Sequence, residues 1–329
     1  MRRRSLLRRT RRRRERDDGG FRLGTALFAL LVLLVVAAIG FELFRNSTLP
    51  IRKFGWNFWR TSDWDPVSGE FGALPFIWGT VYSSVFAIVF ATPIALGIAI
   101  FVSEISANRF RRPLAFLTEL LAAIPSIVYG VWGIFVLVPI VRKFETLVSK
   151  TPLHRLPIFA GPPYGIGMLS AGLILTIMVV PFISSVSREV LRAVPLTQRE
   201  AAYALGATRW EAIKVALRCG RTGIFGAIIL GFGRAFGETM AVTMVIGNNP
   251  QASLSLFAPQ YSMAAVIANE FSEATGDLYL QALTEIGLVL FVITLVINVL
   301  SRVLIWSTGR APKRRIEPAS AAAAAPEAA

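Results

Sequence analysis

The sequence predicts an all-α protein that crosses a membrane about six times. Of its 329 residues, 54% are hydrophobic and only 17% are charged, and the mean hydropathy is +0.58, which is too apolar for a soluble protein. The apolar residues are also collected into long blocks with few breaks. Backbone groups in lipid must be satisfied internally, and blocks of this length without strand alternation achieve that only as helices.

Six blocks have near-spanning length and divide the chain. They cover residues 21–44, 74–102, 114–140, 165–187, 223–246 and 282–306. We expect residues 1–20 to be a basic cytoplasmic segment, residues 21–73 to hold the first helix and an outer loop, and residues 74–310 to form the core. The Ala- and Pro-rich tail, residues 311–329, is expected to be disordered. A signal peptide is the alternative for the first block, but no convincing cleavage site follows it.

Three prolines lie inside the second, third and fourth blocks, at Pro93, Pro125 and Pro181. Each removes a backbone donor and favours a kink, which is compatible with a moving transport pathway. Packing geometry alone is an alternative explanation, because proline is common in membrane helices.

The composition argues against redox, zinc and nucleic-acid chemistry. The chain has one cysteine, Cys219, and one histidine, His154, so neither an internal disulfide framework nor a multi-histidine metal site can form. The net charge is +15, but ten arginines lie between Arg2 and Arg16, directly before the first apolar block. That placement indicates a topology signal, and no nucleic-acid-binding module accompanies it.

Basic residues predict that both termini face the cytoplasm. With the N-terminus inside, the inner segments contain 26 Lys and Arg residues, the outer loops contain eight, and one lies within the membrane. The outer segment 142–155 is basic against this rule. The longest inner loop then covers residues 188–222, and the segment 249–281 faces outward.

The inner loop contains two candidate capping boxes separated by a glycine. Thr197 is followed by Glu200, and Thr208 by Glu211, so each threonine can cap a short helix. Gly206 between them is expected to be a left-handed helix end. We therefore expect a short helix, a sharp turn and a second helix that leads into the fifth span. An amphipathic helix on the bilayer surface is the alternative.

The first of these helices resembles the EAA loop of ABC importer permeases. Glu200, Ala201 and Ala202, followed by Gly206, match that motif. With Ala204 they make a face of mostly small residues, which would allow close approach by a partner. The resemblance implies that the four motif residues dock onto an ATPase subunit and transmit its nucleotide-driven motion. The family motif closes with a Leu-Pro pair at positions that correspond to residues 216–219. This chain has Ala216, Leu217, Arg218 and Cys219 there, so the pair is absent.

Two charges stand inside the predicted fifth span. Arg234 and Glu238 are one helical turn apart, and a salt bridge that neutralises both is the simplest account. The functional alternative is that Arg234 offers a forked donor to a tetrahedral oxyanion, with Glu238 as its resting partner. Gly233 and Gly237 predict a close helix contact. Glu119 lies near the cytoplasmic end of the third block, where a structural or solvated role suffices.

Two segments resemble phosphate-import permeases of the PstC type, namely residues 119–133 and residues 231–248. Together with the inner loop, the resemblance covers about residues 74–306. It implies a permease bundle of the type I ABC importer kind, with phosphate as substrate. It also implies Arg234 and Glu238 as substrate-pathway residues and keeps Glu119 as a secondary candidate.

This chain contains no Walker A pattern and no inner segment large enough for a nucleotide-binding domain, so we expect it not to be an enzyme. The resemblance implies that a separate ATPase dimer holds ATP and Mg, and that this chain binds no cofactor. It also implies a second homologous permease, an extracytoplasmic phosphate-binding protein and a place in the bacterial inner membrane. An ion-coupled secondary anion transporter and a membrane-embedded enzyme are the alternatives, but we find neither inverted repeats nor a catalytic cluster.

Overall fold

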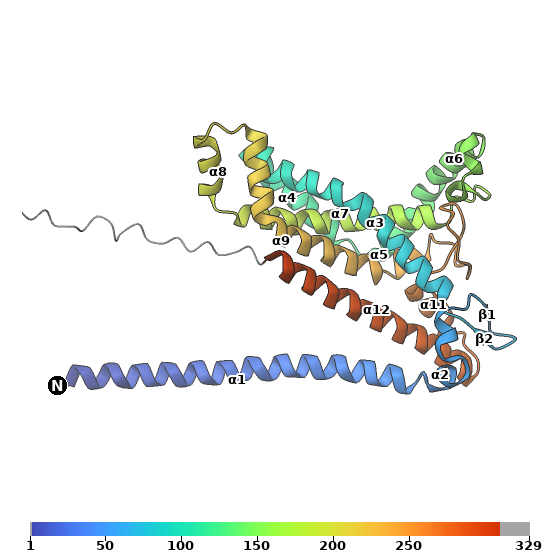
Figure 1. Cartoon of the computed structure of the whole chain (residues 1–329), viewed down its shortest axis with the longest axis horizontal. Coiled ribbons are helices and arrows are strands. Elements are labelled where there is room, and N and C mark those ends of the chain that lie inside the picture. The colour runs from blue at the N-terminus through green and yellow to red at the C-terminus, as the bar shows by residue number, and fades with distance from the viewer. Residues whose placement is uncertain (1, 310–329) are drawn as a thin grey trace, which may run out of the picture.

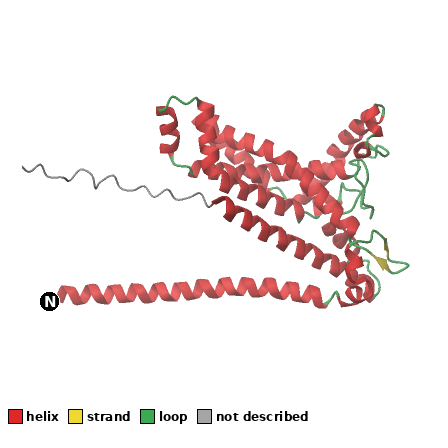
Figure 2. Cartoon of the chain, viewed as in Figure 1, coloured by secondary structure: helices red, strands yellow, loops and turns green. Residues whose placement is uncertain are grey.

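Six helical segments of the described chain are long and apolar enough to cross a membrane, which confirms the predicted number. A computed structural model describes residues 2–309, without the side chains of residues 2–20, 108, 304 and 307–309, and the predicted disordered tail lies outside the described residues. The candidate spans are Phe21–Arg45, Leu74–Ile105, Ser126–Ser149, Met168–Ala193, Arg209–Phe236 and Asp277–Val303. The described part of the chain is mostly helical, with loops and one small hairpin (Figure 2).

Most elements follow one another with short connections. In chain order they are α1 (Arg2–Arg45), α2 (Thr48–Phe54), η1 (Gly55–Trp59), β1 (Trp64–Asp65), β2 (Glu70–Phe71), α3 (Leu74–Ile100), η2 (Phe101–Ile105), α4 (Asn108–Ala123), α5 (Ser126–Trp132), η3 (Gly133–Leu137), α6 (Val138–Ser149), η4 (Pro152–Arg155), η5 (Pro157–Phe159), α7 (Met168–Ala193), α8 (Leu196–Ala204), α9 (Arg209–Phe236), α10 (Met240–Thr243), α11 (Met263–Glu270) and α12 (Asp277–Gly309). Residues 244–262 form a longer segment between α10 and α11. The two strands form an antiparallel hairpin in which Trp64 lies opposite Phe71.

The helix α7 forms the centre of the bundle. Two thirds of its most apolar stretch is buried, and α3, α4 and α9 all pack against it. Met168, Ile174 and Ile183 on α7 are fully enclosed in the main core. At the other extreme, α1 stands apart over most of its length and approaches α12 only near its own C-terminal end (Figure 1), and none of its apolar window is buried. Its apolar surface therefore suits lipid or a partner chain.

The two ends of the bundle carry different elements. The start of α1 and the end of α12 lie at the same end as α8, whereas α2, α6 and the β-hairpin lie at the opposite end (Figure 1). An even number of crossings requires this arrangement. The end that carries α8 is therefore the end where both termini of the described chain lie.

The third predicted block, residues 114–140, is wrong as a single helix. The helix α4 ends at Ala123, Ile124 and Pro125 are extended, and a new helical segment runs from Ser126 to Ser149. Proline provides no backbone donor and disfavours a helical conformation in the residue before it, so the chain breaks where a kink was predicted. The Tyr129 hydroxyl donates to the Leu121 carbonyl at 2.8 Å and satisfies one group freed at this break.

The fifth predicted block, residues 223–246, is also shifted. The helix α9 begins at Arg209 and ends at Phe236, and the next three residues precede the short helix α10. The backbone N–H of Gly237 closes α9 by donating to the Gly233 carbonyl at 3.2 Å. The segment missing the family's Leu-Pro lies within the uninterrupted α9.

The predicted close helix contact at Gly233 and Gly237 does not occur among the described residues. A Cβ at Gly233 would meet nothing within 4 Å, and one at Gly237 would meet only the Gly233 carbonyl oxygen at 3.6 Å. Close approach occurs instead at Gly231, where a Cβ would lie 2.6 Å from Cγ1 of Ile183. Glycine at position 231 therefore sets the distance between α9 and α7.

Candidate functional site

The short helix α8 and its following turn form an exposed surface at one end of the bundle (Figure 1). The described residues of α8 include no buried side chain, and Leu196, Tyr203 and Leu205 are 70%, 51% and 89% exposed. Gly206 has φ +80°, which confirms the predicted left-handed helix end. An exposed helix with apolar side chains and a tight turn is suited to docking against a partner.

Of the two predicted capping boxes, only the second exists. Pro195 occupies the N-cap position of α8, so Thr197 lies inside the helix and its box with Glu200 does not form. The box at α9 is confirmed, because Glu211 accepts the backbone N–H of Thr208 at 2.7 Å and the Thr208 side chain accepts from the Glu211 N–H. Glu200 is exposed on α8 and has no capping role.

A buried ion pair connects α8 to the end of the second span. Arg199 contacts Glu104 through two hydrogen bonds of 2.7 and 3.2 Å, and the two side chains are only 14% and 12% exposed. Arg199 also donates to the Leu191 carbonyl at the end of α7 at 2.8 Å, and Arg209 donates to the Glu104 carbonyl at 2.8 Å. A forked, partly desolvated pair of this kind fixes geometry well.

Sequence reasoning missed this connection. Glu104 lies on η2 and Arg199 lies 95 residues later on α8, so only the folded chain brings them together. The sequence did contain one signal, because Glu104 directly follows an apolar block. A carboxylate at that position requires a partner or solvent, so a partner could have been sought.

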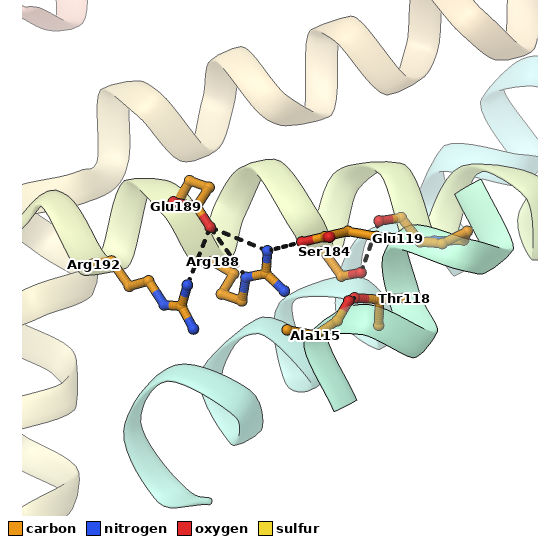
Figure 3. A network of polar contacts seen from close by, with 8 residues as sticks. Ala115, Thr118, Glu119, Ser184, Arg188, Glu189 and Arg192 are labelled. Atoms are coloured by element: carbon orange, nitrogen blue, oxygen red, sulfur yellow. Dashed lines mark hydrogen bonds and ion pairs between the residues drawn. The ribbon is translucent and has the colours of Figure 1, made fainter. Parts of the chain in front are cut away.

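Glu119 lies on α4 and forms an ion pair with Arg188 of α7, with 2.6 Å between Oε1 and Nη2 (Figure 3). Arg188 is 5% exposed at its side chain and Glu119 is 57% exposed. Glu189 contacts the same guanidinium at 3.1 Å and Arg192 at 3.4 Å. The position therefore fits the structural role predicted first for Glu119, which is here to neutralise a buried arginine.

Arg234 and Glu238 do not form the predicted salt bridge in this structure. The helix α9 ends at Phe236, so Glu238 is not on the same helical face, and its carboxylate instead accepts the Ala241 N–H at 3.3 Å. The Arg234 guanidinium carbon lies 5.7 Å from the ring centre of Phe182, and Nε is buried without a hydrogen-bond partner among the described residues. Arg234 is thus a cation without a recorded carboxylate partner in the described part of the chain.

The two helix interruptions meet beside Arg234. The helix α10 packs against α5, and a Cβ at Gly130 would lie 2.5 Å from Sδ of Met244 and 3.2 Å from Cα of Ala241. Arg234 is close enough to Tyr129 on α5 for an electrostatic interaction. Non-helical backbone within a membrane is tolerated where it is buried in protein or lines a cavity. Interrupted helices beside a fixed charge are typical of transport sites.

This architecture defines a membrane permease, and a family comparison gives its class. Residues 91–306 match the family described as the binding-protein-dependent transport system inner membrane component. The chain belongs to this family. The match includes α4 to α11 and most of α12, and it begins within α3, so it contains every candidate site residue discussed above.

The particular relatives are phosphate permeases. The chain is 45% identical over 293 residues to the phosphate transport system permease protein PstC of Mesorhizobium japonicum, covering 88% of this chain and 90% of that protein. It is 47% identical over 290 residues to PstC of Haemophilus influenzae, covering 87% and 92%. The relatives are permease subunits and not enzymes, which confirms the prediction that this chain is a transport subunit.

Solved structures with a similar fold are also ABC importers. A bacterial alginate ABC transporter with a bound periplasmic protein has a TM-score of 0.55 at 16% identity, over 84% of this chain and 93% of that one. The inward-facing MetNI methionine transporter has a TM-score of 0.53 at 17% identity, over 71% and 94%. These likenesses confirm the predicted permease bundle. With the family assignment, they exclude the secondary-carrier and membrane-enzyme alternatives.

Proposed function

We propose that this chain is the membrane-spanning permease of an ABC importer that carries inorganic phosphate into the cell. The observation that carries this proposal is the similarity to PstC proteins at 45 to 47% identity along nearly nine tenths of the chain. The fold of an importer permease and the cation at the helix interruptions both agree with it.

The chain is a multi-pass inner-membrane protein, and we propose that both termini face the cytoplasm. The end of the bundle that carries α8 holds most of the basic residues outside α1, including Arg188, Arg192 and Arg209. The opposite end includes residues 249–281, which contain no Lys or Arg. This asymmetry supports the assignment of the α8 end to the cytoplasm.

Membership of this family implies an ATPase partner and a periplasmic binding protein. We propose that ATP and Mg are held by an ATPase dimer and that this chain binds neither. A second homologous permease would complete the pathway. Exposed apolar side chains on α5 and η3, at Val128, Val131 and Phe135, offer it a contact face, with Phe135 76% exposed.

The proposed coupling element is α8 with its turn, at Glu200, Ala201, Ala202 and Gly206. Their exposure leaves the docking surface free, apart from the half-buried Ala202. The Arg199 contacts with Glu104 and with the end of α7 would make α8 and two spans move together. When the ATPase moves α8, the two spans would then move with it, because no flexible loop separates them from α8 to absorb the motion.

The proposed substrate contact is Arg234. A guanidinium presents forked donors that suit a tetrahedral phosphate, and its charge does not depend on pH in the physiological range. Glu238 would line the same junction while it caps α10. Glu119 lies on α4, before the interruption, and supports the path through Arg188. Alternating access would follow from relative motion of the helices on either side of the interruptions.

Co-purification from native membranes tests this proposal. A mild extraction of the tagged full-length chain should recover an ATPase and a second permease in fixed proportion. Recovery of the chain alone under conditions that preserve other membrane complexes would contradict it.

A further inference from the structure

A cavity lined by arginines lies between the beginning of α4 and the end of α7. Its volume is about 570 Å³, and it is lined by Arg109, Arg111, Arg112 and Arg192. The start of α4 and the end of α7, which supply these arginines, lie at the end of the bundle that carries α8 (Figure 1), and Arg234 is not among the lining residues. Its size is within the usual range of small-molecule sites.

The acids beside this cavity are already engaged. Among the described residues, Arg192 has one ion pair, at 3.4 Å to Glu189, and the same carboxylate oxygen contacts Arg188 at 3.1 Å. Glu119 is held by Arg188 at 2.6 Å. Even so, Nη1 of the buried Arg188 has no recorded partner. Figure 3 shows Glu189 between Arg188 and Arg192, with Glu119 also beside Arg188. Acceptors are therefore scarcer than donors among these described residues.

The three arginines of α4 are partly fixed without being neutralised. The Arg109 guanidinium lies 4.7 Å from the ring centre of Phe110, and Arg111 donates through Nε to the Ser106 carbonyl at 3.1 Å. Neither contact supplies negative charge. Arg112 completes the set from the same turn. Four guanidinium groups around one cavity, with a single shared carboxylate, create a strong positive potential.

The chemistry that fits this potential is a phosphate group. Guanidinium groups bind phosphate oxygens through paired, charge-assisted hydrogen bonds. Arginines at a membrane surface are ordinarily explained as solvated residues that set the orientation of the protein in the membrane. Such arginines need not line a common cavity. At the cytoplasmic surface, two sources of phosphate groups occur, namely the headgroups of anionic lipids and free phosphate.

We propose that Arg109, Arg111, Arg112 and Arg192 form a binding site for a phosphate group, supplied by an anionic phospholipid headgroup or by free inorganic phosphate. The site does not depend on phosphate being the transported substrate, because both sources of a phosphate group occur at the cytoplasmic surface whatever the chain transports. With the proposed orientation, the site is on the cytoplasmic side, next to the helix pair α4 and α7.

The test compares two variants of the full chain within its assembled complex. The site variant is Arg109→Gln with Arg112→Gln, because neither residue has a recorded ion pair in the described structure. The matched control is Lys214→Gln with Arg218→Gln, which removes the same charge from exposed positions on α9 at the same end. All forms carry Arg234→Gln, so that the proposed transport path does not contribute to phosphate binding.

One arm measures lipid and the other measures phosphate. In the first, complexes from nanodiscs of phosphatidylcholine with phosphatidylglycerol are analysed by native mass spectrometry for retained phosphatidylglycerol. In the second, complexes in nanodiscs of phosphatidylcholine alone are titrated with radiolabelled inorganic phosphate. Loss of two charge-assisted contacts should weaken binding by about tenfold or more in one arm.

A selective loss in the lipid arm identifies the ligand as a phospholipid headgroup, and a selective loss in the phosphate arm identifies it as free phosphate. The control variant should remain within about twofold of the parent in both arms, since screened surface charges contribute little. The proposal is overturned if the site variant is unchanged in both arms, or if the control loses as much as the site variant.

Discussion

At the scale of single residues, Arg234 shows what sequence can and cannot predict. A charge inside an apolar block is costly, so its importance was visible without any structure. Its partner was not, because the pairing with Glu238 assumed an unbroken helix, whereas α9 ends at Phe236. Where the helix ends depends on the Gly237 cap and on the packing of α10 against α5, which involves distant parts of the chain.

Removing the charge of Arg234 should stop transport without preventing assembly. Arg234→Gln retains polarity but loses the charge and the fork, so phosphate uptake should fall to background, and Arg234→Lys should give an intermediate rate. Adding Glu238→Gln to Arg234→Gln should not restore uptake, because the two groups form no ion pair in this structure. The assay is uptake in cells without other phosphate carriers, normalised to assembled complex. Near-normal uptake by Arg234→Gln would leave Arg234 a structural role only.

The pair between Glu119 and Arg188 should contribute to stability and not to substrate recognition. Glu119→Gln removes one partner of a buried arginine but leaves Glu189 in contact, so we expect a loss of about 1 kcal/mol or less. Arg188→Gln combined with Glu119→Gln should be less damaging than Arg188→Gln alone. Thermal unfolding of the purified complex measures both. A Glu119→Gln variant of normal stability that transports no phosphate would instead assign Glu119 to the pathway.

At the scale of elements, local signals predicted part of the inner loop, and long-range contacts were not predicted. The capping box at Thr197 was predicted wrongly, because Pro195 occupies the N-cap position of α8. The turn at Gly206 and the capping box at Thr208 follow from residues within four positions of one another, and both are present. The break before Ser126 was predicted only as a kink, because the apolar block continues across it and hides the change of direction. The Glu104 to Arg199 connection depends on tertiary packing and left almost no trace in the sequence.

Two changes should separate docking from coupling. Gly206→Pro cannot adopt φ +80°, so it should distort the docking surface and release the ATPase, whereas Gly206→Ala should be milder. Glu104→Gln leaves the exposed face of α8 intact but weakens the tie to α3, so ATPase should remain bound while uptake per ATP hydrolysed falls. Pull-down of the ATPase and parallel assays of hydrolysis and uptake distinguish them. Equal loss of ATPase in both variants would contradict a separate coupling role for Glu104.

At the scale of the whole molecule, composition alone determined the class of protein. Six apolar blocks required a helical membrane bundle, and the structure contains six candidate spans among its described residues. The apolar faces of α1 and α5 remain uncovered in the isolated chain, which agrees with a subunit that completes its packing with lipid and partner chains. The pattern of spans could not reveal the substrate. The proposal of phosphate rests on Arg234 and on the overall similarity to PstC proteins.

The central claim is that this chain moves phosphate only with an ATPase docked on α8. The most direct measurement is uptake of radiolabelled phosphate into proteoliposomes that contain the chain, its co-purified second permease and the ATPase, with phosphate supplied on its binding protein outside. Uptake should require both the ATPase and ATP inside the liposomes. It should be lost in complexes that carry Gly206→Pro or Arg234→Gln. Phosphate uptake driven by an ion gradient through this chain without the ATPase would contradict it.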